Sequence, residues 1–179
     1  MSARVRVWDP CVRILHGSLV AGVALAWLTS EAGRRWHEPV GWAVAAIVAL
    51  RLVWGAFGSR HARFAGFLRG PRAVIDYARA VLRGRAPRYL GHNPLGAWMV
   101  VALLATLAAL GLSGWLLTTD AFFGSEAMEE LHEALAQGLL GLVALHVGGV
   151  IVTGRHQGEN LVRAMVDGRK RAPAPGDID

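Results

Sequence analysis

Four apolar stretches, each close to the length of a membrane span, constrain the fold of this 179-residue chain more than any other feature. A helix needs about 20 residues to cross a hydrocarbon core about 30 Å thick. Such stretches lie at residues 14–30, 39–57, 95–117 and 131–153. Short connections after the first and third stretches require antiparallel neighbours. The sequence therefore predicts an all-α fold, an integral membrane four-helix up-down bundle.

Composition sets the boundaries of this predicted bundle. We expect one domain over residues 1–171 and a disordered tail over 172–179, where APAPGDID has little apolar surface to bury. No small-residue cleavage site follows the first stretch, so we expect that stretch to stay in the mature protein. The single cysteine, Cys11, excludes an internal disulfide, a cysteine-ligated cluster and a CxxCH heme attachment.

The charged residues are divided unevenly among the segments that flank the apolar stretches. The net charge is +6, and basic residues gather before the first stretch, between the second and third, and after the fourth. The connection between the third and fourth stretches holds only acidic charges. The positive-inside rule places both termini and the middle connection in the cytoplasm. Because the charge follows a membrane topology, we expect no nucleic-acid partner.

The middle connection contains an amphipathic segment, PRAVIDYARAVLRG. At helical spacing its side chains separate into two groups, Val74, Tyr77, Ala78, Val81 and Leu82 on one face and Arg72, Arg79 and Arg83 opposite. We expect a helix on the inner membrane surface with its arginines at the headgroups. A solvated loop helix is the alternative.

Four histidines at membrane depth are the candidate functional residues. His132 and His146 lie fourteen residues apart, which on a helix is about 21 Å along the axis and within about 40° of one face. His16 lies near the inner end of the first stretch, and His37 lies at the outer start of the second. Depth therefore pairs His37 with His132 on the outer side and His16 with His146 on the inner side. Ionisable side chains at such depths are costly to bury and indicate function.

Two pairs of imidazoles at two depths suit two hemes, each with two axial histidines. Such a centre exchanges electrons and has no open position for oxygen chemistry. A zinc site is one alternative, although zinc requires about four converging ligands. Histidines that only hydrogen-bond neighbouring helices are the other alternative.

Arg51 lies fourteen residues after His37, so it shares that residue's face and reaches the depth of the inner pair. We expect its guanidinium to pair with a propionate of the inner heme, because a bidentate contact would offset its burial. The alternative is an arginine that snorkels from the inner end of the span.

The chain resembles the bacterial cytochrome b561 family, which includes the b-type subunits of nickel–iron hydrogenases. The motifs that carry the resemblance are VWDPCVRILHGSLV, HEPVGW followed by LRLVWGAFGSRHARF, RYLGHNPLG, and LHEALAQGLLGLVALHVGGV. The resemblance implies a di-heme protein of the bacterial inner membrane that passes electrons between the quinone pool and a redox partner. It also implies that His16, His37, His132 and His146 are the heme iron ligands. One departure is Gly17, where members often carry an aromatic residue.

Three further histidines, His61, His92 and His156, lie in or beside cytoplasmic loops, and the sequence assigns them no role. His92 immediately precedes Asn93 and Pro94, which are typical of a helix start. It either contacts a quinone headgroup near the inner face or is a surface or capping histidine.

The leading functional hypothesis is electron transfer between quinone and a periplasmic redox protein such as a c-type cytochrome. The acidic residues 126–130 would dock a basic cytochrome, unless they are only a solvated loop. The second hypothesis is a membrane-anchor subunit of a larger oxidoreductase such as a nickel–iron hydrogenase. A self-contained enzyme that oxidises superoxide and reduces quinone is the third, and a non-redox membrane protein is the structural alternative. Direction of electron flow and assembly as a homodimer or larger complex are left open.

Overall fold

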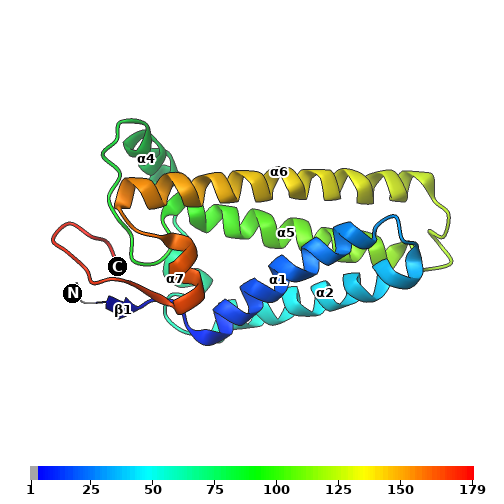
Figure 1. Ribbon diagram of the computed structural model, residues 1–179. Coiled ribbons are helices and arrows are strands. Elements are labelled where there is room, and N and C mark those ends of the chain that lie inside the picture. The colour runs from blue at the N-terminus through cyan, green and yellow to red at the C-terminus, as the bar shows by residue number, and fades with distance from the viewer. Residues whose placement is uncertain (1–3) are drawn as a thin grey trace. The chain divides into compact units, whose positions relative to one another are not determined.

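Four long helices carry the four apolar stretches in the computed structural model, which describes residues 4–179 (Figure 1). Residues 1–3, the start of the predicted domain, lie outside the described range. The long helices are α1 (Pro10–Thr29), α2 (Arg34–Phe57), α5 (Pro94–Leu116) and α6 (Glu126–Gln157). Each is long and apolar enough to cross a membrane. The predicted all-α membrane bundle is confirmed.

All four helices begin before the apolar stretches that predict them, α1, α2 and α6 by four or five residues. Helix α2 begins at Arg34, before Pro39, and α6 begins at Glu126, well before residue 131. A helix can continue past the hydrocarbon core, and the carboxylate of Glu126 in its first turn is favourable beside the positive end of the helix dipole. His37 and His132 therefore lie inside helices, where the backbone fixes the direction of each side chain.

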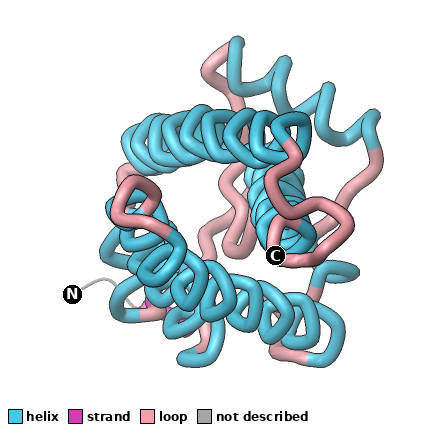
Figure 2. The backbone as a smooth tube through the Cα atoms, turned by 90° about the vertical axis from the view of Figure 1, so that its right-hand side faces the viewer, coloured by secondary structure: helices cyan, strands magenta, loops and turns pink. Residues whose placement is uncertain are grey.

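Shorter elements occupy the connections and the ends of the described chain. They are β1 (Arg4–Arg6), α3 (Phe64–Phe67), α4 (Pro71–Leu82), α7 (Leu161–Asp167) and β2 (Arg169–Arg171). Helix α4 is the predicted amphipathic segment between the second and third spans. Figure 2 shows how little of the chain is strand.

Contacts divide the chain into two compact units. Unit 1 comprises residues 1–13, 53–101 and 145–179, and unit 2 comprises residues 14–52 and 102–144. Each unit takes segments from all four long helices. The prediction of a single domain stays a prediction.

Small residues bring the helices of unit 2 together. A side-chain carbon added to Gly22 of α1 would lie 2.7 Å from Val44 Cγ2 of α2. One added to Gly111 of α5 would lie 3.3 Å from Ala45 Cβ of α2. Such close approach between backbones is how membrane helices gain packing energy where no water is expelled.

Asp9 joins two helix ends in unit 1. Its Oδ1 accepts a hydrogen bond from the Val12 N–H at 3.0 Å and so caps the start of α1. Its Oδ2 accepts from the Ser59 hydroxyl at 2.5 Å and from Trp54 Nε1 at 3.3 Å. Burial alone would raise the pKa of Asp9, but these hydrogen bonds outweigh it and hold the pKa below its usual value. The carboxylate therefore stays charged where it caps α1.

A buried ion network joins the C-terminal segment to the rest of unit 1. Arg88 is 6% exposed and donates to Glu159 Oε2 at 3.1 Å, to the Arg171 carbonyl at 2.9 Å and to the Asp177 carboxylate. The Ile178 N–H also donates to the Arg88 carbonyl at 2.8 Å.

The predicted disorder of residues 172–179 stays a prediction, although the structure gives this segment specific contacts. The segment contributes little apolar surface, but its backbone and carboxylates satisfy a buried guanidinium. Composition counts apolar burial and takes no account of such ionic pairing.

Lys170 of β2 is buried beside this network. It is 4% exposed, its ammonium lies 5.6 Å from the centre of the Trp8 ring, and its strand partner is Val5. Burial is the main cause that lowers the pKa of Lys170 to about 8; the negative charge of Glu159 opposes the shift and the positive charge of Arg88 contributes to it.

We predict that raising the pH stabilises the folded protein through Lys170. Because its pKa is lower in the folded state, the unfolded chain binds more protons between about pH 8 and about pH 10.5, and the free energy of unfolding rises with pH there. The gain from about pH 7 to about pH 9.5 is about 2 kcal/mol. Thermal unfolding of the wild type and of Lys170→Met across this range measures it. An equal rise in the methionine variant would contradict the assignment to Lys170.

Candidate histidine pair and its surroundings

His37 of α2 and His132 of α6 face each other in unit 2. Their ring centres are 6.2 Å apart and the ring planes are nearly perpendicular, at 87°. The two residues are 95 positions apart in the chain, so the helix packing, and no local motif, brings them together. The structure thus joins two histidines that the depth argument pairs.

Hydrogen bonds fix the orientation of both rings. His37 Nδ1 lies 2.9 Å from the Ala26 carbonyl oxygen, and because a carbonyl only accepts, Nδ1 carries the proton. The Ser113 hydroxyl donates to the Leu110 carbonyl at 3.2 Å and so accepts from His132 Nδ1, at 2.8 Å. In both rings the lone pair is then on Nε2. Each imidazole is prepared to bind a metal through that nitrogen.

The separation of the two rings fits one metal ion between them. An imidazole nitrogen binds a metal at about 2 Å and lies about 1 Å from its ring centre, so two ligands on opposite sides of an ion have centres about 6 Å apart. The observed 6.2 Å agrees with this value. Perpendicular planes are compatible with such ligation, because each plane can still contain the axis through the metal. The residues present therefore fit an iron with two axial imidazoles.

The alternative of a zinc site has no support in the described part of the chain. Within residues 4–179 no three His, Cys, Asp or Glu side chains are grouped so that they could hold a metal ion. Two imidazoles alone leave two positions of a tetrahedral zinc without a protein ligand. A planar macrocycle supplies the remaining ligands of a six-coordinate iron by itself.

Gly114 leaves room beside His132. A side-chain carbon at Gly114 would lie 3.3 Å from His132 Cε1, closer than most real contacts of that kind. Ser113, one residue earlier, is 3% exposed and makes the hydrogen bond to the same ring. Two neighbouring residues of α5 therefore position His132. Ser113 does so by its hydrogen bond, and Gly114 does so because it has no side chain that would displace the ring.

Arg51 is buried in unit 2. It is 6% exposed and lies on α2 with Val44 and Val48, which are 7% and 3% exposed. These three residues and His37 recur at intervals of three, four or seven, which places them on one face of the helix. An arginine that snorkels to the surface would be more exposed, so burial favours the inward orientation predicted for Arg51.

The other two predicted ligands lie in different units. His16 is half-buried in the α1 segment of unit 2, and His146 is half-buried in the α6 segment of unit 1. Their pairing stays a prediction.

The three remaining histidines belong to unit 1 and have different surroundings. His92 packs against the tilted rings of Trp8 and Phe67, at 4.7 Å and 4.4 Å between ring centres. His61 Nε2 lies 3.0 Å from Asp179 Oδ1. His156 is exposed in the last turn of α6. The predicted helix start after His92 is confirmed, because α5 begins at Pro94 and Asn93 Oδ1 accepts from the Gly96 N–H at 2.8 Å.

Comparison with known proteins decides the family. A protein-family model described as prokaryotic cytochrome b561 matches residues 7–168, nearly the whole chain. The chain belongs to the prokaryotic cytochrome b561 family. It is therefore a multi-pass membrane protein, a b-type cytochrome that binds heme and acts in electron transfer. No curated protein and no solved structure matches the chain.

Sequence reasoning missed the residues that orient the two rings of this cytochrome. Ser113 lies in an apolar span, and the Ala26 carbonyl is a backbone group that any residue would supply. The available signal was the hydroxyl itself, since Ser113 and Thr106 carry the only hydroxyls of this apolar span and such groups usually bond a neighbouring helix.

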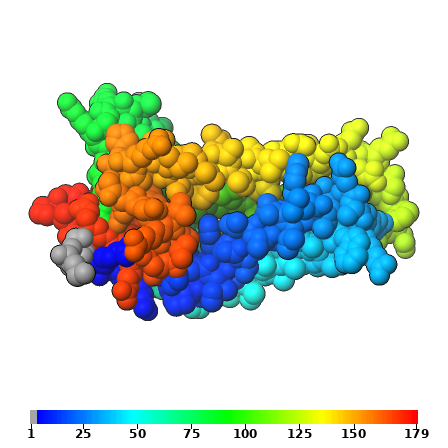
Figure 3. Space-filling model, in the orientation of Figure 1, coloured from blue at the N-terminus to red at the C-terminus, as the bar shows by residue number. Residues whose placement is uncertain are grey.

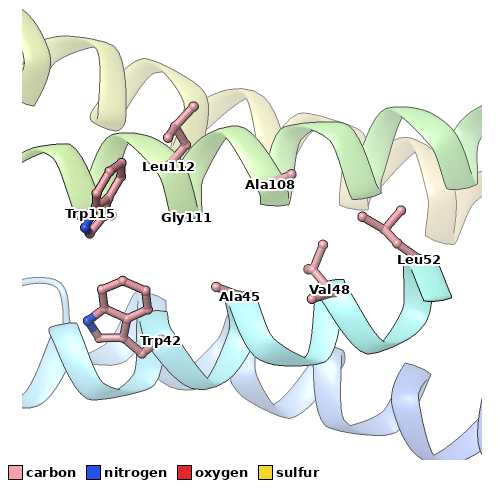
Figure 4. Close-up of a pocket in the computed structure, with 9 residues that line it drawn as sticks. Trp42, Ala45, Val48, Leu52, Ala108, Gly111, Leu112 and Trp115 are labelled. Atoms are coloured by element: carbon pink, nitrogen blue, oxygen red, sulfur yellow. The ribbon is translucent and has the colours of Figure 1, made fainter.

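An apolar groove lies between α2 and α5 in unit 2 of the cytochrome (Figure 4). Its volume is about 410 Å³, within the usual range for small-molecule sites. Trp42 and Trp115 face each other at one end, and Leu52 lies at the other. Trp115 directly follows the Ser113–Gly114 pair that contacts His132. The remaining lining residues are Ala45, Val48, Ala49, Ala108, Gly111 and Leu112.

We predict that Ser113→Ala weakens heme retention in the cytochrome without abolishing it. The substitution removes the acceptor of the His132 Nδ1 proton, and loss of such a partner usually lowers metal affinity about 10- to 100-fold. Competition of the purified protein with apomyoglobin measures the rate and extent of heme loss. Ser30→Ala is the matched control, because that hydroxyl, just after the end of α1, donates to the Trp27 carbonyl in the last turn of the helix. Equal heme loss in both variants would show that Ser113 has no positioning role.

Proposed function

We propose that this cytochrome transfers electrons between the quinone pool and a periplasmic redox partner such as a c-type cytochrome. It would do so through two b hemes, one held by His37 and His132 and the other by His16 and His146. The proposal places the protein in the bacterial inner membrane with both termini in the cytoplasm, as the positive-inside rule predicts.

The observation that carries the proposal is the geometry of His37 and His132. Two imidazoles at 6.2 Å, each with its Nδ1 proton already hydrogen-bonded, are arranged to bind one iron and to leave it no open position. Bound there, a heme supplies a one-electron couple whose potential follows from its axial ligands, their hydrogen bonds and burial. The protein's own contribution is to fix both ligands before and after the electron moves.

Two hemes follow from helix periodicity. His146 lies on the same face of α6 as His132, about 21 Å further along the axis. Arg51 lies on the face of α2 that carries His37, at the corresponding separation, and its buried guanidinium supports a carboxylate partner at that depth. One pair near each side of the membrane would let electrons cross it.

The groove between α2 and α5 supports a lipid-soluble partner. Its lining is apolar, as an isoprenoid tail requires, and its tryptophan end adjoins the residues that hold His132. We propose quinone as the occupant of this groove. His92, the histidine that the sequence offers as a quinone contact, packs against the tilted rings of Trp8 and Phe67 in unit 1.

The acidic residues at the start of α6 support a basic protein as the redox partner that exchanges electrons with the cytochrome on its periplasmic side. Glu126, Glu129 and Glu130 are exposed. Exposed charges of one sign steer an oppositely charged protein and raise the rate of encounter. The alternative function, a membrane anchor of a larger oxidoreductase, is not favoured by the comparisons.

The test is electron transfer through the reconstituted cytochrome. In proteoliposomes that contain quinol, the absorbance spectrum should show that heme b becomes reduced. The heme should be reoxidised when a basic c-type cytochrome is added outside. Protein that dithionite reduces but quinol does not would overturn the quinone half of the proposal. Reduction by quinol without reoxidation by the c-type cytochrome would overturn the partner half.

The groove provides a matched pair of variants for this assay. We predict that Ala108→Phe fills the groove and lowers the rate of reduction by quinol about tenfold or more, since it removes substrate binding and not the redox centre. Ala105→Phe is the control, because Ala105 is also exposed on α5 and does not line the groove. Heme content should be equal in both. If quinol reduces the heme at similar rates in the two variants, the groove is not the quinone site.

A further inference from the structure

Helix α4 packs against the rest of unit 1 through Tyr77, one of the residues on its predicted apolar face. Tyr77 is 6% exposed, and its ring lies 5.6 Å from the ring of Tyr89 in an edge-to-face arrangement. Tyr77 therefore packs against protein. The predicted helix on the inner membrane surface stays a prediction, and an amphipathic pattern alone does not say which part of its apolar face meets protein and which meets the membrane.

A different edge of α4 is apolar and exposed. Ile75 is 50% exposed and Leu82 is 87% exposed. They lie seven residues apart, so their directions differ by only about 20° around the helix. Arg72, Arg79 and Arg83 share the neighbouring face, within about 40° of one another. The helix thus presents an apolar edge directly beside a basic face, and Figure 3 shows its green side chains at the molecular surface.

A hydrogen bond sets the depth at which α4 begins. Trp98, in the first turns of α5, donates from Nε1 to the Arg69 carbonyl oxygen at 2.9 Å. Its side chain is otherwise exposed, as is typical of tryptophans at the boundary between membrane and water. Arg69 lies two residues before α4. Since Trp98 begins a membrane span, α4 begins at the level of the lipid headgroups.

The charges of this segment are available to an external partner. Residues 69–85 contain five arginines and one carboxylate, Asp76. Arg79 lies 3.7 Å from Asp76, and both are highly exposed, so the pair is weak. Among the described residues, neither Arg72 nor Arg83 makes an ion pair. Anionic headgroups would complement this face.

We propose that α4 docks on the surface of an anionic phospholipid bilayer. Ile75 and Leu82 enter the boundary between headgroups and acyl chains, and Arg72, Arg79 and Arg83 bind lipid phosphates. A soluble acidic protein would match the arginines but would not account for an apolar edge held at headgroup depth. This docking is separate from electron transfer and does not depend on the proposed function.

The test measures the depth of α4 in the full-length, heme-loaded protein. Spin labels are attached singly at Ile75→Cys, Leu82→Cys or Asp76→Cys in a Cys11→Ala background. The proteins are placed in vesicles of phosphatidylcholine alone or mixed with phosphatidylglycerol. Accessibility to oxygen, which partitions into lipid, is compared with accessibility to a water-soluble nickel complex. With phosphatidylglycerol, we expect labels at 75 and 82 to favour oxygen and the label at 76 to favour nickel.

A charge variant tests the arginines separately. One variant combines Arg72→Gln, Arg79→Gln and Arg83→Gln. In this variant the ratio of lipid-docked to water-exposed label at position 82 should fall about fivefold for each arginine removed. Arg6→Gln, an exposed arginine of β1, is the control, and unchanged heme content shows that both variants fold. Labels at 75 and 82 that are as accessible to nickel as the label at 76 would overturn docking. Equal depth in both vesicle types would overturn the recognition of anionic lipid.

Discussion

His132→Ala should yield a cytochrome with about one heme b per chain fewer than the wild type. The substitution removes one axial ligand and leaves an apolar space beside Gly114, which offers no replacement donor. The opposite ligand, His37, keeps its hydrogen bond to the Ala26 carbonyl but cannot hold a six-coordinate iron alone. A pyridine hemochrome assay on detergent-purified protein, with protein quantified independently, measures the loss.

The control for this variant lies on the same helix. His156→Ala removes an exposed histidine from the last turn of α6, so heme content should stay at the wild-type value. Unchanged heme content in His132→Ala would mean that this histidine contributes to helix packing and does not bind heme. It would also remove the observation on which the proposed function rests.

Combining substitutions tests the pairing as well as the ligands. If His37 and His132 hold the same heme, His37→Ala with His132→Ala should lose no more heme than either single variant, because residues that act as a unit are not additive. His132→Ala with His146→Ala should lose both hemes. A heme loss that is additive for His37 and His132 would contradict the pairing.

The parts of this structure that the sequence predicts are those in which local rules and membrane physics agree. An apolar stretch of about 20 residues has few folds available to it in lipid, because every backbone polar group must be satisfied inside the segment. Helix periodicity then assigns side chains to faces and depths. The pairing of His37 with His132 follows from depth alone, and their ring geometry in unit 2 agrees with it.

The parts that the sequence does not predict depend on contacts between distant segments. Ser113 orients His132 across two helices, and nothing near Ser113 in the chain indicates which group it would meet. The face of α4 that packs against protein is chosen by Tyr89, which also follows from tertiary structure.

The contacts of the C-terminal segment also depend on residues that are distant in the chain, in this case on charged residues. Glu159 Oε1 accepts from the Arg171 N–H at 2.6 Å, and Asp177 meets both Arg88 and the Ala174 N–H. The hydrogen bond from Ala174, with that from Arg88, holds the pKa of Asp177 below its usual value. Three charged residues far apart in the chain become a network only after the fold has formed.

Arg88→Ala should destabilise the folded protein by about 3 kcal/mol or more, the usual cost of removing one partner from a buried ion pair. Arg88 is buried with Glu159, whose nearest oxygen lies 3.1 Å away, and it also bonds Asp177 and the Arg171 carbonyl. Alanine would leave two carboxylates and a carbonyl without this donor in a region from which water is largely excluded. The energy lost is chiefly the cost of those unpaired groups and not the worth of the ion pair itself.

Thermal unfolding followed by tryptophan fluorescence, together with limited proteolysis of the C-terminal segment, measures this effect. The melting temperature should fall, and cleavage within residues 172–179 should become faster, because Arg88 bonds both Asp177 and the Arg171 carbonyl. Arg163→Ala is the matched control, since its ion pair with Asp167 is exposed to solvent and contributes little. If both variants melt and are cleaved alike, the buried network does not hold the segment. The tail would then have to be held by its backbone hydrogen bonds with Arg88 and Leu90 and by the contacts of the Asp179 carboxylate with Arg60 and His61.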